Sequence, residues 1–352
     1  MPDWTKSMKQ SYEYYVVDPV SWNDIRRVDG VMSCGITRDS TVDTLGSATI
    51  DIAESVGECY IRAYLVTEQD GRTEKEPLAT VLVQTPSSKF DGKIRSVSMD
   101  AYTPLIELKE GLPPLGYSRL KDEPIMDSVY TICRDNMRAP VVKPQNDKTL
   151  YSDFVSQPND TWLTFCRDLA SNAKFTIGLD EMGRVIFEPA IPLEQMQPKW
   201  TYTDGENSIM LPEIDMDHDI YGIPNVVEVV YSTANVYYVA RAVNDDPNSP
   251  VSTVNRGREI LHRVTDLSMI GNPTNYQIDE YAKTVLKQLS SVEYTVKYTH
   301  GYCPVRVGDC VRINYEKAGI KNIKARVVSQ SIKCEPGCPV TETAVFTEKL
   351  WG

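Results

Sequence analysis

The sequence of 352 residues has few histidines and lacks any hydrophobic run long enough to cross a membrane. Only three histidines occur, His218, His262 and His300, so little of the acid–base and metal chemistry that histidine usually supplies is available. No apolar run approaches the roughly 18 residues that a membrane-spanning helix needs. The polar segment from Met1 to Gln10 lacks the apolar core of a secretory signal. We therefore expect a soluble protein that is made in the cytosol and reaches the outside of a cell only as part of a particle.

The short motifs of common enzyme classes are also absent. There is no H-E-x-x-H zinc motif, no G-x-S-x-G nucleophile elbow, no phosphate-binding Walker loop and no G-x-G-x-x-G dinucleotide motif. Carboxylates are plentiful, so residue type alone does not exclude a pair for glycoside cleavage, but no segment points to one. We expect no catalytic residues, no cofactor and no metal site, and we predict that the chain is not an enzyme.

Two places in the sequence are weak candidates for chemistry. His218 lies in the acidic segment 215–219. Cation-binding loops need regularly spaced oxygens and a sharp glycine turn, so a solvated acidic loop is the better interpretation. Cys303 lies three residues from His300, an arrangement that a thiol nucleophile and its base can adopt. No third group that would orient this histidine is evident in the sequence.

Eight cysteines are present, and in a cytosolic chain they are reduced by default. Cys133 and Cys166 fall in helical apolar patterns and are expected to act as small core residues. Four others lie near the C-terminus: Cys303, Cys310, Cys334 and Cys338. A four-cysteine zinc site is conceivable there, but the usual spacing is tighter and paired. We expect structural thiols.

The composition has an excess of acidic residues. Asp and Glu number 49 against 37 Lys and Arg, which gives a formal net charge of −12. Affinity for nucleic acid comes mainly from Lys and Arg, so this balance argues against phosphate neutralisation as the main task. Two interpretations stay open: the acidity keeps the protein soluble, or it lets DNA pass nearby without binding.

The first thirty residues differ in composition from the rest of the chain. They are rich in large aromatic residues, among them Trp4, Tyr12, Tyr14 and Trp22, and show no clean helix or strand period. Leaving so many rings in water would be costly. We therefore predict that residues 1–30 form an N-terminal arm that packs on the body of the protein or on a neighbouring subunit.

Residues 31–112 show the pattern of short β-strands. Apolar and polar residues alternate at 48–52 and again at 61–65. Turns are expected at 69–71 and at 91–92, where a glycine makes positive φ inexpensive. Closely spaced strands with such turns predict a first antiparallel β domain, a barrel or a sandwich.

Residues 113–199 combine helices and strands. Apolar residues recur at helical spacing from Met126 to Cys133, after Pro124, which suits a first helical turn. A second apolar stripe runs from Trp162 to Ala173. Two short strand patterns with a turn between them occur at 175–187. These patterns predict a small α/β insert domain.

Residues 200–352 return to β patterns, with one helix among them. A run rich in valine at 226–230 predicts a buried strand. A helix at about 274–291 is predicted by an apolar stripe without a polar break, and Thr274 with Gln277 fits a capping box at its start. The expected fold is therefore mainly β, with two antiparallel β domains flanking an α/β insert.

Several segments resemble one known group of proteins. The segment Asp160–Ala170, with the sequence DTWLTFCRDLA, followed by Phe175 and by Val185–Phe187, resembles a recurrent unit of that group. The group comprises the baseplate hub proteins of contractile phage tails, the phage late-control D proteins and the N-terminal part of type VI secretion spike proteins. The second β domain resembles the same group in Ile223–Val229 and in Arg306–Val311.

The start of the chain adds to this resemblance. The segments Trp4–Met8 and Ile36–Ile52 are similar to hub proteins of phages of Gram-positive bacteria and of related tailocins. The resemblance covers nearly the whole chain. The sequence has no C-terminal peptidase or lysozyme extension and no spike β-helix, so a stand-alone hub is expected.

The resemblance implies a fold, an assembly and a set of partners. Each chain would carry two tail-tube-like antiparallel β-barrel domains, and three chains would form a pseudo-six-fold ring that joins the hexameric tail tube to the trimeric spike. The implied partners are two further copies of the chain, the spike protein, tube or tube-adaptor proteins, other baseplate proteins and the C-terminus of the tape-measure protein. DNA would pass through the channel without specific binding, and no membrane insertion is expected. The location would be the tail baseplate of the virion, assembled in the cytoplasm of the host bacterium.

Two other functions stay open at this stage. One is a cell-wall hydrolase of the tail tip, and the other is a β protein that binds a carbohydrate or a receptor. The host stays open too, as does the choice between a phage, a tailocin and another contractile injection system.

Overall fold

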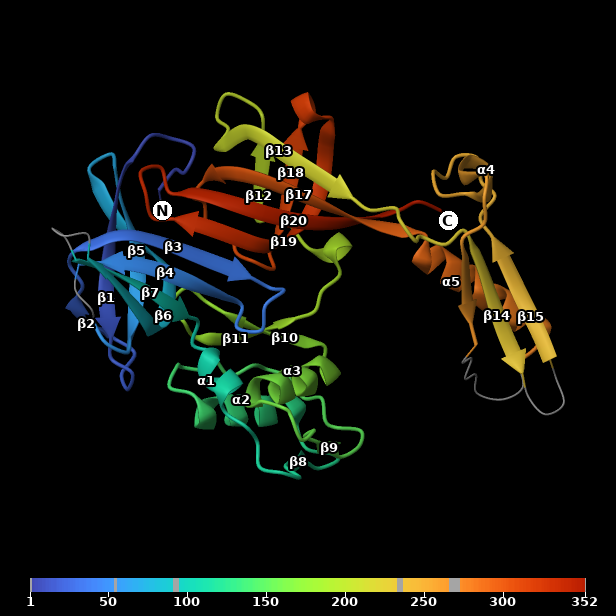
Figure 1. Ribbon diagram of the computed structural model, residues 1–352, viewed down its shortest axis with the longest axis horizontal. Helices are drawn as coiled ribbons and strands as arrows, with labels where there is room; N and C mark the ends of the chain where they lie inside the picture. The colour runs from blue at the N-terminus through green and yellow to red at the C-terminus, as the bar shows by residue number, and fades with distance from the viewer. Residues whose placement is uncertain (1, 54–55, 91–94, 233–236, 266–272, 352) are drawn as a thin grey trace. The chain divides into compact units, whose positions relative to one another are not determined.

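The computed structural model describes residues 2–53, 56–90, 95–232, 237–265 and 273–351 (Figure 1). Strands dominate the regular structure, and most of the described ladders are antiparallel. This arrangement confirms the predicted class, mainly β with a small α/β part. None of the described helices is both long and apolar enough to cross a membrane.

The chain divides into two compact units. The larger one comprises Met1–Ile214 and Lys297–Ala344, and the smaller one comprises Asp215–Val296 and Val345–Gly352. Two compact units do not by themselves mark domain boundaries, so the division predicted from the sequence stays a prediction. Its four parts are 1–30, 31–112, 113–199 and 200–352.

The strands from the first third of the chain form one end of a 13-stranded sheet. They are β1 (Lys9–Val17), β2 (Asp24–Arg27), β3 (Val31–Asp39), β4 (Gly46–Ile52), β5 (Cys59–Gln69), β6 (Arg72–Phe90) and β7 (Arg95–Tyr102). They follow the order β3-β4-β7-β6-β5-β1-β2. The predicted turn between β5 and β6 is confirmed, because Asp70 and Gly71 both have positive φ, of 50° and 73°. The turn expected at 91–92 lies outside the described residues.

The other strands of this sheet come from the last part of the chain. They are β12 (Trp200–Thr203), β13 (Met210–His218), β17 (Ser291–Gly301), β18 (Cys310–Tyr315), β19 (Ile320–Lys333) and β20 (Pro339–Lys349). Their order is β13-β17-β20-β19, and β18 and β12 branch from β19. A short 3₁₀ turn, η2 (Glu316–Ala318), comes after β18. Among the described strands, β3 and β19 make the one ladder that joins the two sets into a single sheet.

The predicted N-terminal arm contains two strands, β1 and β2. β1 pairs with β5 along its whole length, from Lys9 opposite Glu68 to Val17 opposite Tyr60. Tyr14 and Val16 are buried in the sheet's core. The period of two that marks a strand is present in the sequence from Tyr12 through Tyr14 to Val16, but the adjacent Tyr15 and Val17 obscure it.

The α/β part of the larger unit has its own core. It contains helices α1 (Ile106–Glu110), α2 (Ile125–Asn136) and α3 (Trp162–Asn172), the hairpin β10 (Phe175–Leu179) and β11 (Val185–Pro189), the strand pair β8 (Ser118–Arg119) and β9 (Phe154–Val155), and the turn η1 (Leu193–Gln195). The predicted stripe of α3 is confirmed, with Phe165, Cys166 and Leu169 fully buried against α2. Thr161 caps α3, since its side chain accepts a hydrogen bond from Thr164 N.

The smaller unit is a helix packed on a three-stranded sheet. The strands are β14 (Val226–Ser232), β15 (Tyr237–Val243) and β16 (Leu261–Val264), and the helices are α4 (Thr253–Arg256) and α5 (Asn275–Leu289). The capping box predicted for α5 is confirmed, because Thr274 Oγ1 accepts from Gln277 N and Gln277 Oε1 accepts from Thr274 N. Its stripe packs on β14 and β15 through Ile278, Ala282 and Leu286.

Candidate functional site

The pair His300 and Cys303 belongs to a buried polar network. His300 Nδ1 lies 3.9 Å from Cys303 Sγ, and His300 Nε2 lies 3.4 Å from Glu342 Oε2. Glu342, on β20, is the third group that the sequence did not reveal. However, His300, Cys303 and Glu342 are only 1%, 2% and 0% exposed. A nucleophile must touch its substrate, so in this fold the three residues act as a core network rather than as a catalytic site.

The network satisfies its members with hydrogen bonds inside the core. Glu342 accepts from Gln330 Nε2 at 2.7 Å and from the hydroxyl of Tyr298, and Tyr202 Oη lies 3.1 Å from His300 Nε2. Burial by itself would lower the pKa of His300, but its hydrogen bonds with Cys303 and Glu342 outweigh burial and raise that pKa to about 10. The raised pKa favours the protonated ring, whose Nε2–H faces Glu342 Oε2.

The acidic segment around His218 is part of a strand and not the loop that we expected. It forms the end of β13, where Asp215 and Asp217 are exposed. The His218 ring stacks on Tyr294, with ring centroids 4.6 Å apart. Within the described residues, no group of three or more His, Cys, Asp or Glu side chains is placed to hold a metal ion.

The four cysteines near the C-terminus do not share one site. Cys303 lies beside His300, and the Cys310 thiol faces its neighbouring backbone at Val311 O. Cys334 lies instead next to Cys34. All eight cysteines are free thiols in this structure.

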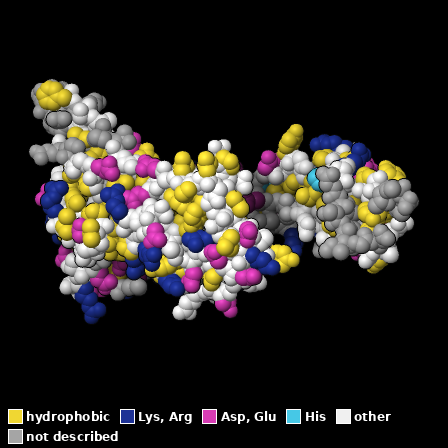
Figure 2. Space-filling view, turned by 90° about the horizontal axis from the view of Figure 1, so that it is seen from below, with side chains coloured by type: hydrophobic (Ala, Val, Ile, Leu, Met, Phe, Trp, Pro, Cys, Tyr) yellow, Lys and Arg dark blue, Asp and Glu magenta, His cyan; other side chains and the backbone are white. Residues whose placement is uncertain are grey.

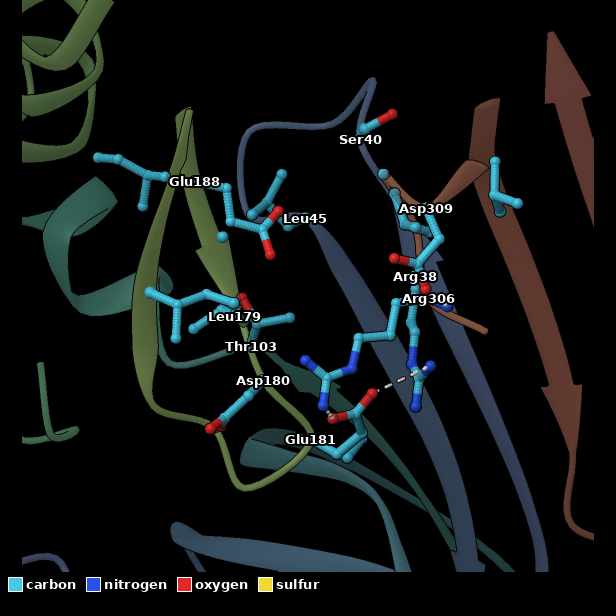
Figure 3. Close-up of a pocket in the computed structure, with 18 of the residues that line it drawn as sticks. Arg38, Ser40, Leu45, Thr103, Leu179, Asp180, Glu181, Glu188, Arg306 and Asp309 are labelled. Carbon is cyan, nitrogen blue, oxygen red and sulfur yellow. Dashed lines mark hydrogen bonds and ion pairs between the residues drawn. The ribbon is translucent and has the colours of Figure 1, made fainter. Parts of the chain in front are cut away.

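The larger unit also contains a charged cavity of about 830 Å³. It is lined by β3, β6, the β10–β11 hairpin and the segment 302–309. Figure 3 shows Glu181 between two guanidinium groups, with ion-pair distances of 2.6 Å to Arg306 and 3.6 Å to Arg38. These residues come from three segments far apart in sequence, and the ion pairs fix the hairpin to the sheet.

The turn of the β10–β11 hairpin is inserted among side chains of the large sheet. Met182 O accepts hydrogen bonds from Trp22 Nε1 at 2.7 Å and from Arg62 at 3.2 Å, and Glu181 O accepts one from Thr80 at 3.3 Å. Gly183 has a φ of +75°, and a Cβ there would lie 2.8 Å from Thr80 Cβ. Only glycine fits this position without a shift of the sheet or the turn.

Two more carboxyl groups reach the cavity. Desolvation raises the pKa of Asp309, and desolvation together with the negative charge of Asp309 raises the pKa of Glu188. The described lining includes apolar side chains such as Leu45 and Leu179 but no histidine and no cysteine. The cavity can hold a small ligand or a peptide segment with polar and apolar parts, and sequence analysis missed it because its residues come from distant segments.

The surface mixes both signs of charge. On the face that Figure 2 shows, Lys and Arg side chains are interspersed with Asp and Glu and with hydrophobic side chains. The net charge of −12 is therefore not gathered into one acidic field on that face.

No protein-family model matches this sequence, and no curated protein matches it. Solved structures, however, match along almost the whole chain. The 43 kDa tail protein of prophage MuSo2 from Shewanella oneidensis has a TM-score of 0.65 at 10% identity, over 96% of this chain and 98% of that chain. The tail protein from Neisseria meningitidis MC58 has a TM-score of 0.60 at 13% identity, over 96% and 97%.

A third match is a chain from a complex that contains VgrG, and the sequence resemblance also included spike proteins of type VI secretion. A chain in the Francisella PdpA–VgrG complex has a TM-score of 0.54 at 9% identity, and the alignment covers 98% of this chain and 58% of that chain. At such identities the likeness shows the fold alone. The chain has the fold of these tail and VgrG-complex proteins, as the resemblance implied.

Proposed function

We propose that this chain is a structural component of a phage or tailocin tail and serves as the hub of its baseplate. Three copies form a pseudo-six-fold ring that joins the hexameric tail tube to the trimeric spike and surrounds the channel for DNA. The observation that carries the proposal is the end-to-end match with tail proteins, which spans 96% or more of both chains for the Shewanella and Neisseria structures. Matches of this extent compare whole architectures and not a single shared module.

The large sheet supports a scaffolding role. Strands from both ends of the chain join in one sheet through β3 and β19, and the ion pairs of Glu181 with Arg38 and Arg306 tie the α/β hairpin to it. We expect such a body to be rigid, as an adaptor between rings of different symmetry requires. The spike, the tube or tube-adaptor proteins, other baseplate proteins and the tape-measure C-terminus are the proposed partners. The protein is assembled in the bacterial cytoplasm and remains in the virion.

We also propose that the chain is not an enzyme. Among the described residues, a Cys–His–carboxylate arrangement at Cys303, His300 and Glu342 is sealed from solvent. The described lining of the cavity offers no histidine or cysteine, and its carboxyl groups Glu188 and Asp309 are the residues whose substitution tests the hydrolase alternative. Purified protein should therefore leave peptidoglycan intact in a zymogram in which lysozyme clears the gel. Clearing that disappears on a single Glu or Asp substitution would favour the hydrolase alternative.

Electron microscopy tests the hub proposal. The protein should be imaged alone and after co-expression with the neighbouring tail genes, because the ring can require its spike partner. We expect three copies on the axis of the particle, in a ring with a wide channel. Six copies per baseplate, or one copy off the axis, would show that the adaptor role is wrong.

A further inference from the structure

Two cysteines lie directly opposite one another where β3 meets β19. The ladder pairs Gly35 with Lys333, so its next position pairs Cys34 with Cys334, and Cys334 N donates to Cys34 O at 2.9 Å. Opposed residues of an antiparallel pair project to the same face, with Cα atoms about 5.5 Å apart when hydrogen-bonded. A disulfide spans Cα distances of roughly 4.4–6.8 Å, so the Cα spacing of such a pair suits the bond. The Cβ atoms of a hydrogen-bonded pair lie at the wide end of about 4.5–5.5 Å, so closing the bond needs the two strands to approach by up to about 1 Å.

The side chains also meet. The Cys34 and Cys334 side chains lie within hydrogen-bonding range of each other, and the Tyr14 side chain lies within range of both. Cys34 is 5% exposed, whereas Cys334 is partly exposed as a residue, so Cys334 is the member of the pair that lies nearer to solvent. Cys133 and Cys166 form a second pair of adjacent thiols. They differ from Cys34 and Cys334 in exposure, because both are fully buried between α2 and α3.

We propose that Cys34 and Cys334 form a disulfide when the protein meets a low-molecular-weight disulfide such as oxidised glutathione. The Cys334 thiolate attacks one sulfur of the oxidant and releases one small thiol. The Cys34 thiolate then attacks the Cys334 sulfur of the mixed disulfide and releases the second small thiol. Two electrons pass from the cysteine pair to the oxidant, and the two cysteine protons end on the two released thiols.

The disulfide would cross-link β3 to the end of β19, and the ladder between these strands is the one described ladder that joins the two sets of strands in the large sheet. It would close a loop of about 300 residues, and constraint of the unfolded chain grows with loop length. The hydrogen bond with Cys34, together with burial, raises the pKa of Cys334. Thiolate is therefore scarce at neutral pH, and the exchange should speed up as the pH rises.

Formation of this disulfide does not depend on the proposed role in a tail. That role would, however, expose the protein first to a reducing and then to an oxidising environment. A reducing cytosol keeps the pair open during assembly, and an oxidising exterior closes it after release. Because the test uses the purified chain alone, its outcome is independent of the proposed ring.

Peptide mapping tests the proposal. The full-length protein is incubated with oxidised glutathione at pH 7 and at pH 8.5, alkylated, digested with trypsin without reduction and analysed by mass spectrometry. We expect a cross-linked peptide joining residues 28–38 to residues 334–349, formed faster at pH 8.5. We also expect Tm to rise by roughly 5 °C on oxidation.

Cys338 lies on the same tryptic peptide, so it supplies the matched control. Cys338→Ser should keep both the cross-link and the rise in Tm, whereas Cys334→Ser and, independently, Cys34→Ser should lose both. Absence of the cross-link in the wild-type protein, its persistence in Cys334→Ser, or a bond between Cys334 and Cys338 would overturn the proposal.

Discussion

In the larger unit, charged side chains are buried where distant segments meet, whereas in the smaller unit the layer between helix and sheet is apolar. Arg62 is 1% exposed and binds Asp24 at 2.7 Å. In the smaller unit, Arg241 and Arg263 flank Glu228 with side chains that are 45% and 56% exposed. Buried charges demand one geometry, because a charge without its partner is costly, whereas an apolar layer depends mainly on shape and volume. The two units should therefore respond differently to substitution, and variants in each unit test that difference.

Arg62→Met should have the largest effect. It removes a buried guanidinium that binds Asp24 Oδ1, Thr80 Oγ1 at 2.8 Å and Met182 O. Breaking a buried ion pair typically costs 3–5 kcal/mol, so we expect a loss of about 3–5 kcal/mol in the free energy of unfolding. Chemical denaturation measures it. Arg134→Met, which removes an exposed ion pair with Asp135, is the control and should cost less than about 1 kcal/mol. Equal effects of the two variants would contradict the comparison.

Leu286→Ala should destabilise the smaller unit by roughly 2–5 kcal/mol, as truncation of a fully buried leucine does. Leu286 is 0% exposed in the layer between α5 and its sheet. Hydrogen exchange should become faster in residues 215–296 and stay unchanged in the strands β1–β7. Lys283→Ala on the exposed side of the same helix should change little. Unaltered exchange around α5 would show that the helix does not support this unit.

The His300 network should make the stability of the larger unit depend on pH. The pKa of His300 in the folded protein, about 10, lies above its ordinary value of 6.5. The folded protein therefore keeps a proton that the unfolded chain loses, so this contribution is complete below pH 6.5 and is lost as the pH rises towards 10. The slope is at most about 1.4 kcal/mol per pH unit.

Tm measured between pH 6.5 and 7.5 checks this dependence below the range in which ordinary thiols and tyrosines titrate. We expect Tm to fall across this range in the wild-type protein and to fall less in His300→Gln, whatever the absolute stability of that variant. Identical slopes in both proteins would mean that the histidine is neutral in the fold.

Gly183→Ala should cost about 1–3 kcal/mol, because it combines positive φ with a clash against Thr80 Cβ at 2.8 Å. Gly71→Ala is the matched control in the same unit, since Gly71 has a φ of +73° and open space around it. The loss of stability in Gly71→Ala should therefore measure the strain of an alanine at positive φ without a steric clash. Thr80→Ala in the Gly183→Ala background should recover part of the loss in a thermal melt. A loss no larger than that of Gly71→Ala would show that the turn is not tightly enclosed.

Local patterns predicted much of the fold. The apolar stripe and the capping residues Thr274 and Gln277 predicted α5, and the stripe from Trp162 predicted α3. Pairings between distant segments were not predictable. Glu342 meets His300 only because β20 lies beside β17, and Glu181 meets Arg38 and Arg306 only when the hairpin turn is docked on the sheet. The periodicity of a single sequence predicts individual helices and strands, but it does not predict which distant elements pack against each other. The polar network and the cavity were therefore found only in the structure.

The ladder between β3 and β19 has a mechanical consequence. It consists of five residue pairs, from Asp39 opposite Ser329 to Gly35 opposite Lys333. Antiparallel hydrogen bonds run perpendicular to their strands. A force along the strands therefore loads all of these bonds together in shear, whereas a force across them opens the bonds one after another from an end. Single-molecule pulling with the two orientations should give a higher rupture force in shear, so the direction of this ladder within an assembled particle would set how much axial force the protein transmits before its sheet divides.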